Sequence, residues 1–142
     1  RWPPQPVQIQ GEGAQEGELR RLLAGHGALL GRRGDVPDLL RRAAVLVVPS
    51  RWEGFGLVAA EGLAAGVTVV TTGVDGLHEV VGDAALRIPG EDPRALADAV
   101  NRVLRSPALA MELSAKGRER SARFGLDRMV ARYEAIYAQM TD

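Results

Sequence analysis

Two glutamates, Glu53 and Glu61, flank a short glycine-containing segment near the middle of the chain. Gly54 and Gly56 lie between them, and an apolar stretch that predicts a helix begins at Leu57. Glycines let the backbone approach a ligand closely, and the free N–H groups of a helix's first turn attract anions. A carboxylate one turn inside such a helix can accept hydrogen bonds from two neighbouring hydroxyls, as a ribose offers. The segment is therefore suited to binding a phosphate or diphosphate together with a sugar.

The helix predicted over Leu57–Ala65 is apolar on every side except at Glu61. Such a helix is expected to be buried, and a buried carboxylate is costly unless it is paired, hydrogen-bonded or waiting for a ligand. The alternative is that Glu61 pairs with a core arginine and that Glu53 is a charge on the loop surface. The chemistry of the residues alone leaves these two interpretations level.

The segments that must position these glutamates alternate between strand and helix. Strands are predicted at Val7–Gln10, Ala28–Leu30, Val45–Val48, Val67–Thr71 and Ala84–Ile88. Helices are predicted at Gln15–Ala24, from Asp35 or Pro37 to about Ala43, at Leu57–Ala65, from Asp75 or Gly76 to Val81, and at Pro93–Arg105, Ala108–Arg123 and Leu126–Gln139. Unbroken β-branched runs are typical of parallel strands covered on both faces. The pattern predicts an α/β fold with a parallel, doubly wound, Rossmann-like sheet, whose ligands bind at the carboxyl ends of the strands.

The composition excludes several classes of protein. The 142 residues are enough for one globular domain, and the 18 basic and 18 acidic residues cancel, so no net charge favours nucleic acid. There is no cysteine and there are only two histidines, which argues against thiolate catalysis and zinc sites. No apolar run is long enough to span a membrane, and no signal-peptide pattern opens the chain. We therefore expect a cytoplasmic protein.

The segment around the two glutamates resembles the E-x7-E motif of retaining, GT-B-fold glycosyltransferases of the family 4 type. Glu53 and Glu61 are separated by seven residues within Pro-Ser-x-x-Glu-Gly-Phe-Gly-Leu-x-x-x-Glu-x-x-Ala-x-Gly. The similarity continues upstream through Gly11–Gly13, Leu30-Gly31 and Val45–Ser50. Downstream it continues through Val69–Thr72, Gly76–Val81 and Ala95–Val100, so it covers essentially the whole chain.

The resemblance implies that residues 1–142 are the C-terminal, nucleotide-sugar-binding domain of a two-domain enzyme. It implies that Glu53 is catalytic and contacts the transferred sugar, and that Glu61 binds the ribose hydroxyls. Backbone N–H groups of the glycine segment would hold the sugar and the diphosphate, and a second loop would lie against the base. The implied donor-binding residues are Gly13, Gly31, Arg32, Gly54, Phe55, Gly56, Leu57 and Glu61. Neither a cofactor nor a metal is implied, because fixed positive groups and the helix end stabilise the leaving diphosphate.

One departure from the family pattern is an absence. The family's donor domain begins with a strand and loop that carry an Arg and a Lys-Gly pair, and both clamp the diphosphate. The lone lysine here, Lys116, lies in a late predicted helix. The absent strand is the central one, so the first and third strands of this chain would have unpaired edges. We therefore expect a fragment, inactive alone, whose partner is the missing N-terminal acceptor-binding domain.

The expected activity is transfer of a hexose from a nucleoside diphosphate sugar to an unknown acceptor. One alternative is a non-catalytic nucleotide-binding or interaction domain of the same fold, and another is a relative of the nucleotide-sugar epimerases. The pair Glu53 and Glu61 favours the transferase, because a degenerate binding module would have little reason to keep both carboxylates. The base, the sugar and the acceptor stay open, as does peripheral membrane contact of the parent protein.

Overall fold

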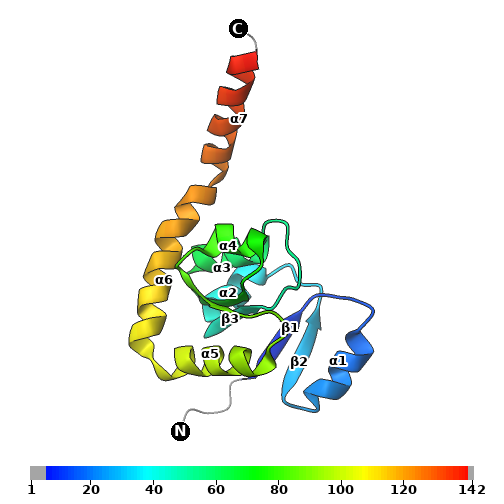
Figure 1. Ribbon diagram of the computed structural model, residues 1–142. Coiled ribbons are helices and arrows are strands. Elements are labelled where there is room, and N and C mark those ends of the chain that lie inside the picture. The colour runs from blue at the N-terminus through cyan, green and yellow to red at the C-terminus, as the bar shows by residue number, and fades with distance from the viewer. Residues whose placement is uncertain (1–5, 141–142) are drawn as a thin grey trace. The chain divides into compact units, whose positions relative to one another are not determined.

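The computed structural model describes residues 6–140, which fall into two compact units that divide between Val36 and Pro37 (Figure 1). In the first unit, strands β1 (Val7–Gln10) and β2 (Gly27–Gly31) pair in parallel, with Val7 opposite Gly27. Helix α1 (Glu16–Leu23) connects them and packs on β2. This is a βαβ connection, as the alternation of strand and helix predicts.

The second unit is built on a three-stranded parallel sheet. Strands β3 (Val45–Val48), β4 (Thr68–Thr72) and β5 (Ala85–Ile88) lie in the order β3-β4-β5. The helices are α2 (Val36–Arg42), α3 (Leu57–Ala65), α4 (Asp75–Val81), α5 (Pro93–Arg105), α6 (Pro107–Ser121) and α7 (Leu126–Met140), and a 3₁₀ turn, η1 (Ala122–Phe124), separates the last two. In a parallel sheet the carboxyl ends of all three strands meet at one edge, where ligands of such folds bind.

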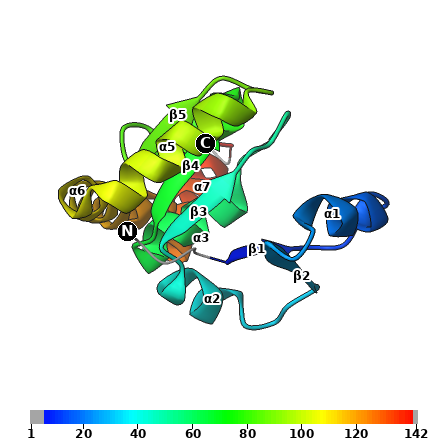
Figure 2. The ribbon, with the colours of Figure 1, turned by 90° about the horizontal axis from the view of Figure 1, so that it is seen from below.

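Helices cover both faces of this sheet, because successive residues of a strand point to opposite sides. Val69 of the central strand packs with Leu63 of α3 and Leu77 of α4, and all three are fully buried. Val70 faces the other way and packs with Val103 of α5, which Figure 2 shows lying along the sheet. Strand β4 is therefore buried along its whole length between the two layers of helices, whereas β3 and β5 are buried only in part.

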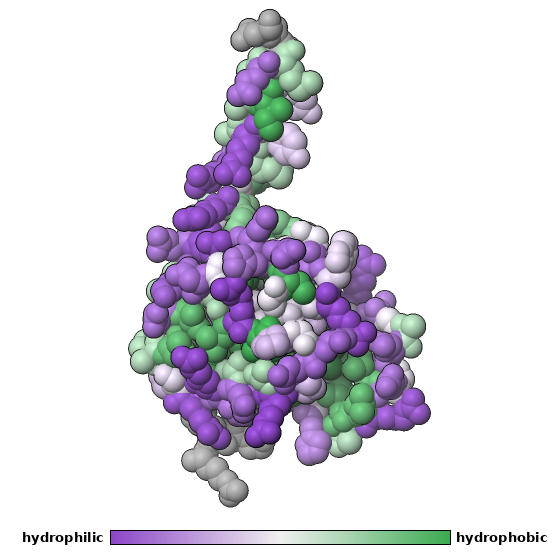
Figure 3. Space-filling view, in the orientation of Figure 1, coloured by the Kyte–Doolittle hydropathy of each residue, from purple (hydrophilic) through white to green (hydrophobic). Residues whose placement is uncertain are grey.

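The last helix, α7, extends beyond the sheet of the second unit and makes its main contacts with η1. Its large apolar side chains are exposed, and Figure 3 shows hydrophobic residues along it beside hydrophilic ones. These side chains are Leu126, Met129, Val130, Tyr133, Ile136, Tyr137 and Met140. Within residues 6–140, no helix has the length and apolarity that crossing a bilayer requires.

The predicted α/β class with parallel, Rossmann-like strands is confirmed, and most element bounds agree within a residue or two. Two details differ. The helix predicted to reach Arg123 ends at Ser121, because the chain tightens into η1. The strands form two sheets rather than one. Among the described residues β1 pairs only with β2, and β3 pairs only with β4.

Candidate functional site

The glycine segment forms a loop, residues 49–56, that joins the end of β3 to the start of α3. Gly56 is the N-cap residue of α3 and has a φ of +90°, in the left-handed region that favours glycine. Its carbonyl accepts the helix's first hydrogen bond, from the N–H of Ala60 at 3.1 Å. No side chain in the described part of the chain caps this helix end. The first-turn N–H groups therefore have no side-chain acceptor among the described residues, and their binding of an anion stays a prediction.

Glu53 is half-buried in this loop, and its carboxylate is bound by one neighbouring hydroxyl group. The hydroxyl of Ser50 donates to its Oε2 at 3.3 Å. The carbonyl of Ser50 in turn accepts from the buried Thr72 hydroxyl, at the end of β4, at 2.6 Å. The neighbouring Thr71 hydroxyl donates to Val48 O at 3.0 Å. The carboxyl end of β4 thus anchors the start of the loop, and through Ser50 it orients the Glu53 carboxylate.

Glu61 is exposed, so the expectation that it is a buried carboxylate is wrong. Only one face of α3 is buried, and its buried residues are Ala59, Gly62 and Leu63. Leu57 is 69% exposed, and Glu61 lies four residues further on, over the same face of the helix. The apolar composition of α3 suggested burial all round, but the described residues cover it from one side only. A core arginine partner for Glu61 is therefore also wrong.

The other predicted loop residues lie in one continuous stretch with Glu53. Gly54 is exposed and Gly56 is buried. Phe55 is 41% exposed, and its ring packs edge to face on Phe124 of η1, with centroids 5.4 Å apart. Glu53, Gly54, Phe55, Gly56 and Leu57 thus line the carboxyl end of β3 and the N-terminus of α3.

A second group of predicted residues lies in the first unit, at the carboxyl ends of β1 and β2. Gly31 has a φ of +63°, and its carbonyl accepts from the N–H of Gly11 at 3.0 Å. The carboxylate of Glu12 accepts from the backbone N–H of Arg32 at 3.2 Å. These contacts bring the loop that carries Gly13 against Gly31 and Arg32. The grouping of these residues with the glycine loop of the second unit stays a prediction.

The two arginines after β2 differ in their surroundings. Arg33 is bound by Asp35 through hydrogen bonds of 2.8 and 2.6 Å, and this carboxylate raises the pKa of the Arg33 guanidinium. The side chain of Arg32 is exposed. Arg32, which the family resemblance assigns to the donor site, thus lies exposed directly after β2, and its contact with the donor stays a prediction.

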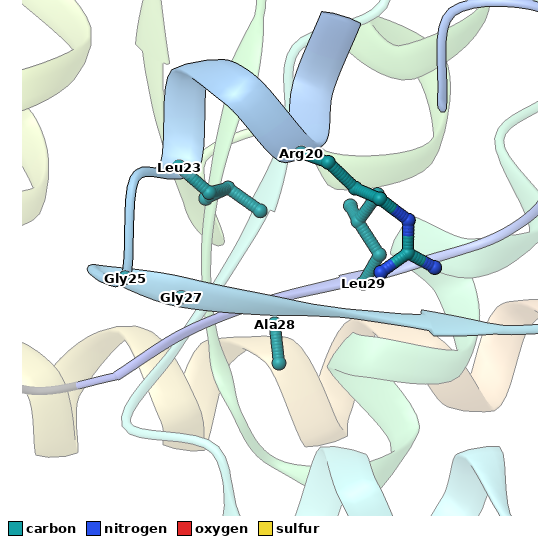
Figure 4. A pocket seen from close by; sticks show the side chains of 6 residues that line it. All are labelled: Arg20, Leu23, Gly25, Gly27, Ala28 and Leu29. Carbon is teal, nitrogen blue, oxygen red and sulfur yellow. The ribbon is translucent and has the colours of Figure 1, made fainter. Parts of the chain in front are cut away.

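The first unit also has a hollow of about 310 Å³ between α1 and β2 (Figure 4). It is lined by Arg20, Leu23, Gly25, Gly27, Ala28 and Leu29. Arg20, its charged member, is already paired with Glu16 at 2.7 Å. The hollow lies along the amino-terminal part of β2, away from the carboxyl ends of the strands where Gly31 and Arg32 lie. We assign it no part in the candidate site.

Several residues that support the site are absent from the sequence predictions. Glu12, Ser50 and Thr72 hold backbone or carboxylate groups of the two loops through the contacts described above. Phe124 holds Phe55 from a segment 69 residues later in the chain. Ser50 and Thr72 could have been predicted as site residues, because both are polar and follow predicted strands closely. No local pattern indicates a pairing as distant as that of Phe55 with Phe124.

Residues 5–106 match the protein family described as Glycosyl transferases group 1. An uncharacterized glycosyltransferase of Methanocaldococcus jannaschii is 35% identical over 121 residues, which are 82% of this chain and 34% of that protein. A D-inositol 3-phosphate glycosyltransferase of Xylanimonas cellulosilytica is 41% identical over 111 residues, 77% of this chain and 27% of that protein. The chain therefore spans about a third or less of the length of these relatives.

Solved glycosyltransferase structures share the fold. Sucrose-phosphate synthase of Thermosynechococcus elongatus superimposes with a TM-score of 0.82 and 32% identity, over 94% of this chain and 38% of that one. HepE of Anabaena, solved in complex with UDP-glucose, superimposes with a TM-score of 0.87 over 96% of this chain and 42% of that one, and at 21% identity this is a likeness of fold alone. Because the family match covers well over half of the residues, this chain belongs to the group 1 glycosyltransferases.

Proposed function

We propose that this chain is the nucleotide-sugar-binding half of a retaining, metal-independent glycosyltransferase that transfers a hexose from a nucleoside diphosphate sugar. The observation that carries the proposal is the placement of Glu53. Its carboxylate is half-buried, is oriented by Ser50, and precedes by a few residues an α-helix whose N-terminus no described side chain caps. A carboxylate for the sugar and a positive end for the phosphates are thus combined in one loop.

The start of α3 suits the diphosphate. The backbone N–H groups of Gly54, Phe55, Gly56 and Leu57 lie along the loop and the first helical turn, and the helix dipole adds positive potential there. In the transfer step a nucleophilic group of the acceptor bonds to the anomeric carbon and gives up its proton, the bond between that carbon and the diphosphate oxygen breaks, and negative charge grows on the leaving nucleoside diphosphate. Donors that are already fixed before the reaction stabilise this charge without reorganising. We assign Glu53 to the transferred sugar and the backbone N–H groups to the diphosphate.

Glu61 suits the ribose. Its carboxylate is exposed, so a ligand can reach it without displacing a protein partner. It lies one helical turn from Leu57, over the same face, and it can accept hydrogen bonds from both hydroxyls of a ribose. We assign Gly13, Gly31 and Arg32 to the base of the nucleotide. The acceptor would be bound by a domain that this chain does not contain, so the chain alone would bind its donor weakly and transfer nothing.

Calorimetric titration of the full-length protein with UDP, GDP and ADP tests the donor site. One nucleotide is expected to bind, and Glu61→Ala should weaken that binding about tenfold or more, because a charged hydrogen-bond acceptor is lost. Glu53→Ala should reduce sugar transfer far more than nucleotide affinity. Glu119→Ala, which removes an exposed glutamate of α6, is the matched control and should behave as the wild type. Equal losses of transfer and affinity in Glu53→Ala would contradict its assignment to the sugar.

The product distinguishes the alternatives. Incubation with a panel of nucleoside diphosphate hexoses, followed by NMR of the anomeric proton, should show transfer with the donor's configuration retained. Inverted product would refute the retaining assignment. Free epimerised sugar nucleotide would favour the epimerase alternative, and nucleotide binding without turnover would favour a non-catalytic module. Full activity in the presence of EDTA is expected, and its loss would contradict metal independence.

A further inference from the structure

The first turn of α4 lies against the backbone of the glycine loop. A β-carbon built on Gly76, the second residue of α4, would lie 2.7 Å from the carbonyl oxygen of Gly54 and closer still to that of Glu53. Ordinary contacts of a β-carbon begin at 3.4 Å, and separations under 3.0 Å are essentially never found. The two backbones are thus too close to leave room for even a methyl group. Neither carbonyl belongs to a flexible side chain, so neither can turn away cheaply.

The next residue of α4 contacts the other end of the same loop. The Cδ2 of Leu77 lies 2.5 Å from the position that a β-carbon on Gly56 would take. Leu77 is fully buried in the core with Val80 and Val81 of the same helix. Two successive residues of α4 therefore support the loop from Glu53 to Gly56, and the core holds Leu77 in turn.

The far end of α4 is also fixed. Arg120 of α6 donates from Nε to the carbonyl of Val80 at 2.5 Å and from its Nη2 to that of Glu79 at 2.6 Å. These carbonyls belong to the last turn of α4, which has no intrahelical donors for them. Packing and capping together make α4 a rigid support under the loop.

The conformation of Gly76 itself does not require glycine. It lies inside a helix and has no positive φ, unlike Gly56. At such a position alanine favours the helix more than glycine does. What excludes a side chain at Gly76 is its contact with the loop that carries Glu53.

We propose that Gly76 is a positioning residue, which sets the Glu53 carboxylate and the adjacent N–H groups by letting α4 approach the loop backbone. The proposal rests on the function proposed above for Glu53. A methyl group at this position displaces the loop by on the order of 1 Å, a misplacement that can cost about 100-fold in rate. Glu61 lies on α3 outside the displaced segment, so binding of the nucleoside part should persist.

The test compares Gly76→Ala with Gly90→Ala in the full-length protein. A β-carbon on Gly90 meets nothing within 4 Å, so this control has the same change of residue without the contact. For Gly76→Ala we expect kcat for sugar transfer to fall about 100-fold, with the affinity for the matching nucleoside monophosphate unchanged within error. Hydrogen exchange measured by mass spectrometry should accelerate in residues 50–57 and stay unchanged in α5. Gly90→Ala should match the wild type in all three measurements.

Wild-type kcat and wild-type exchange in Gly76→Ala would overturn the proposal. If the wild type itself binds no nucleotide, the proposed function fails, while exchange in residues 50–57 still tests positioning by Gly76. If Gly76→Ala does not fold, Leu77→Val replaces it, because shortening this side chain removes the support beneath Gly56. The same loss of kcat with retained monophosphate affinity would support the proposal, and unchanged kcat would refute it.

Discussion

The ring of Phe55 meets the ring of Phe124 edge to face, with ring planes inclined at 84°. Phe55 belongs to the glycine loop, and Phe124 belongs to η1, the turn that precedes α7. Phe124 also packs against the core between α3, α4 and the sheet. The family match ends at residue 106, so this contact comes from a segment beyond it. The C-terminal part of the chain therefore helps to hold the loop that carries Glu53.

A double-mutant cycle should measure this contact. Edge-to-face aromatic pairs contribute about 0.5–1.5 kcal/mol beyond the area that they bury, so Phe55→Leu and Phe124→Leu should show a coupling energy of that size. The measurement is the free energy of unfolding in urea for the wild type, both single variants and the double variant. Strictly additive losses would show that the two rings do not stabilise each other.

Variants of Thr71 and Thr72, at the end of β4, should separate an effect on the free energy of unfolding from an effect on the loop that carries Glu53. Thr72→Val leaves the carbonyl of Ser50 without its donor and should cost about 1–3 kcal/mol of unfolding free energy. Because Ser50 also donates to Glu53, this variant of the full-length protein should also lower kcat for the proposed sugar transfer. Thr71→Val removes a buried hydroxyl that donates to Val48, within the sheet, and should destabilise to a similar extent with kcat unchanged. Equal kcat values for the two variants would contradict the anchoring of Glu53 through Ser50.

The end of α3 depends on a left-handed residue, Gly66, with a φ of +76°. Its N–H donates to Leu63 O at 3.1 Å, and the next N–H, of Val67, donates to Gly62 O at 3.2 Å. Gly66→Ala should destabilise the protein by about 1–2 kcal/mol, because a β-carbon is strained in this conformation. Gly66→Asn should cost less, since asparagine tolerates the left-handed region, although both variants must displace the side chain of Arg118. Thermal unfolding ranks the two variants, and the reverse order would contradict the explanation.

Lys116 should have no part in donor binding. Glu112 raises the pKa of Lys116 by a 2.8 Å hydrogen bond and by its charge, and Asp83 adds a smaller effect. The pairing stabilises the fold while the lysine is charged, so its contribution is present below the ordinary pKa of 10.5 and is lost as the pH rises through the raised value. Lys116→Gln should leave donor KM and kcat unchanged at neutral pH. A rise in donor KM would show that this lysine acts on the phosphates after all.

The sequence predicted the elements of the fold well, because the local signals are strong. The apolar run Val45–Val48 and the glycine that ends α3 fall where the structure has them. The exposure of Glu61 was mispredicted for a physical reason. An apolar helix favours burial on all sides. Its composition does not show how many of its faces the rest of the chain covers, and the described residues cover one face of α3.

Residues of the candidate site that are adjacent in sequence could be predicted, whereas contacts between segments distant in sequence could not. Glu53 to Leu57 are contiguous, so their grouping follows from the loop itself. The hydrogen bond from Arg32 N–H to Glu12 joins residues that are 20 apart, and the approach of Gly76 to Glu53 joins residues from different elements. Such contacts depend on strand order and helix packing, which no single segment of sequence encodes.

The exposed apolar face of α7 has a practical consequence for work with the protein. Side chains such as Met129, Tyr133 and Ile136, spaced along the helix, are about half exposed or more. A contiguous apolar surface of this kind promotes self-association in water. Preparations in which this face is uncovered should sediment as larger species as their concentration rises, and those that end at Gly125 should remain monomeric. Light scattering at several concentrations would therefore be a sensible first check before any titration with nucleotides.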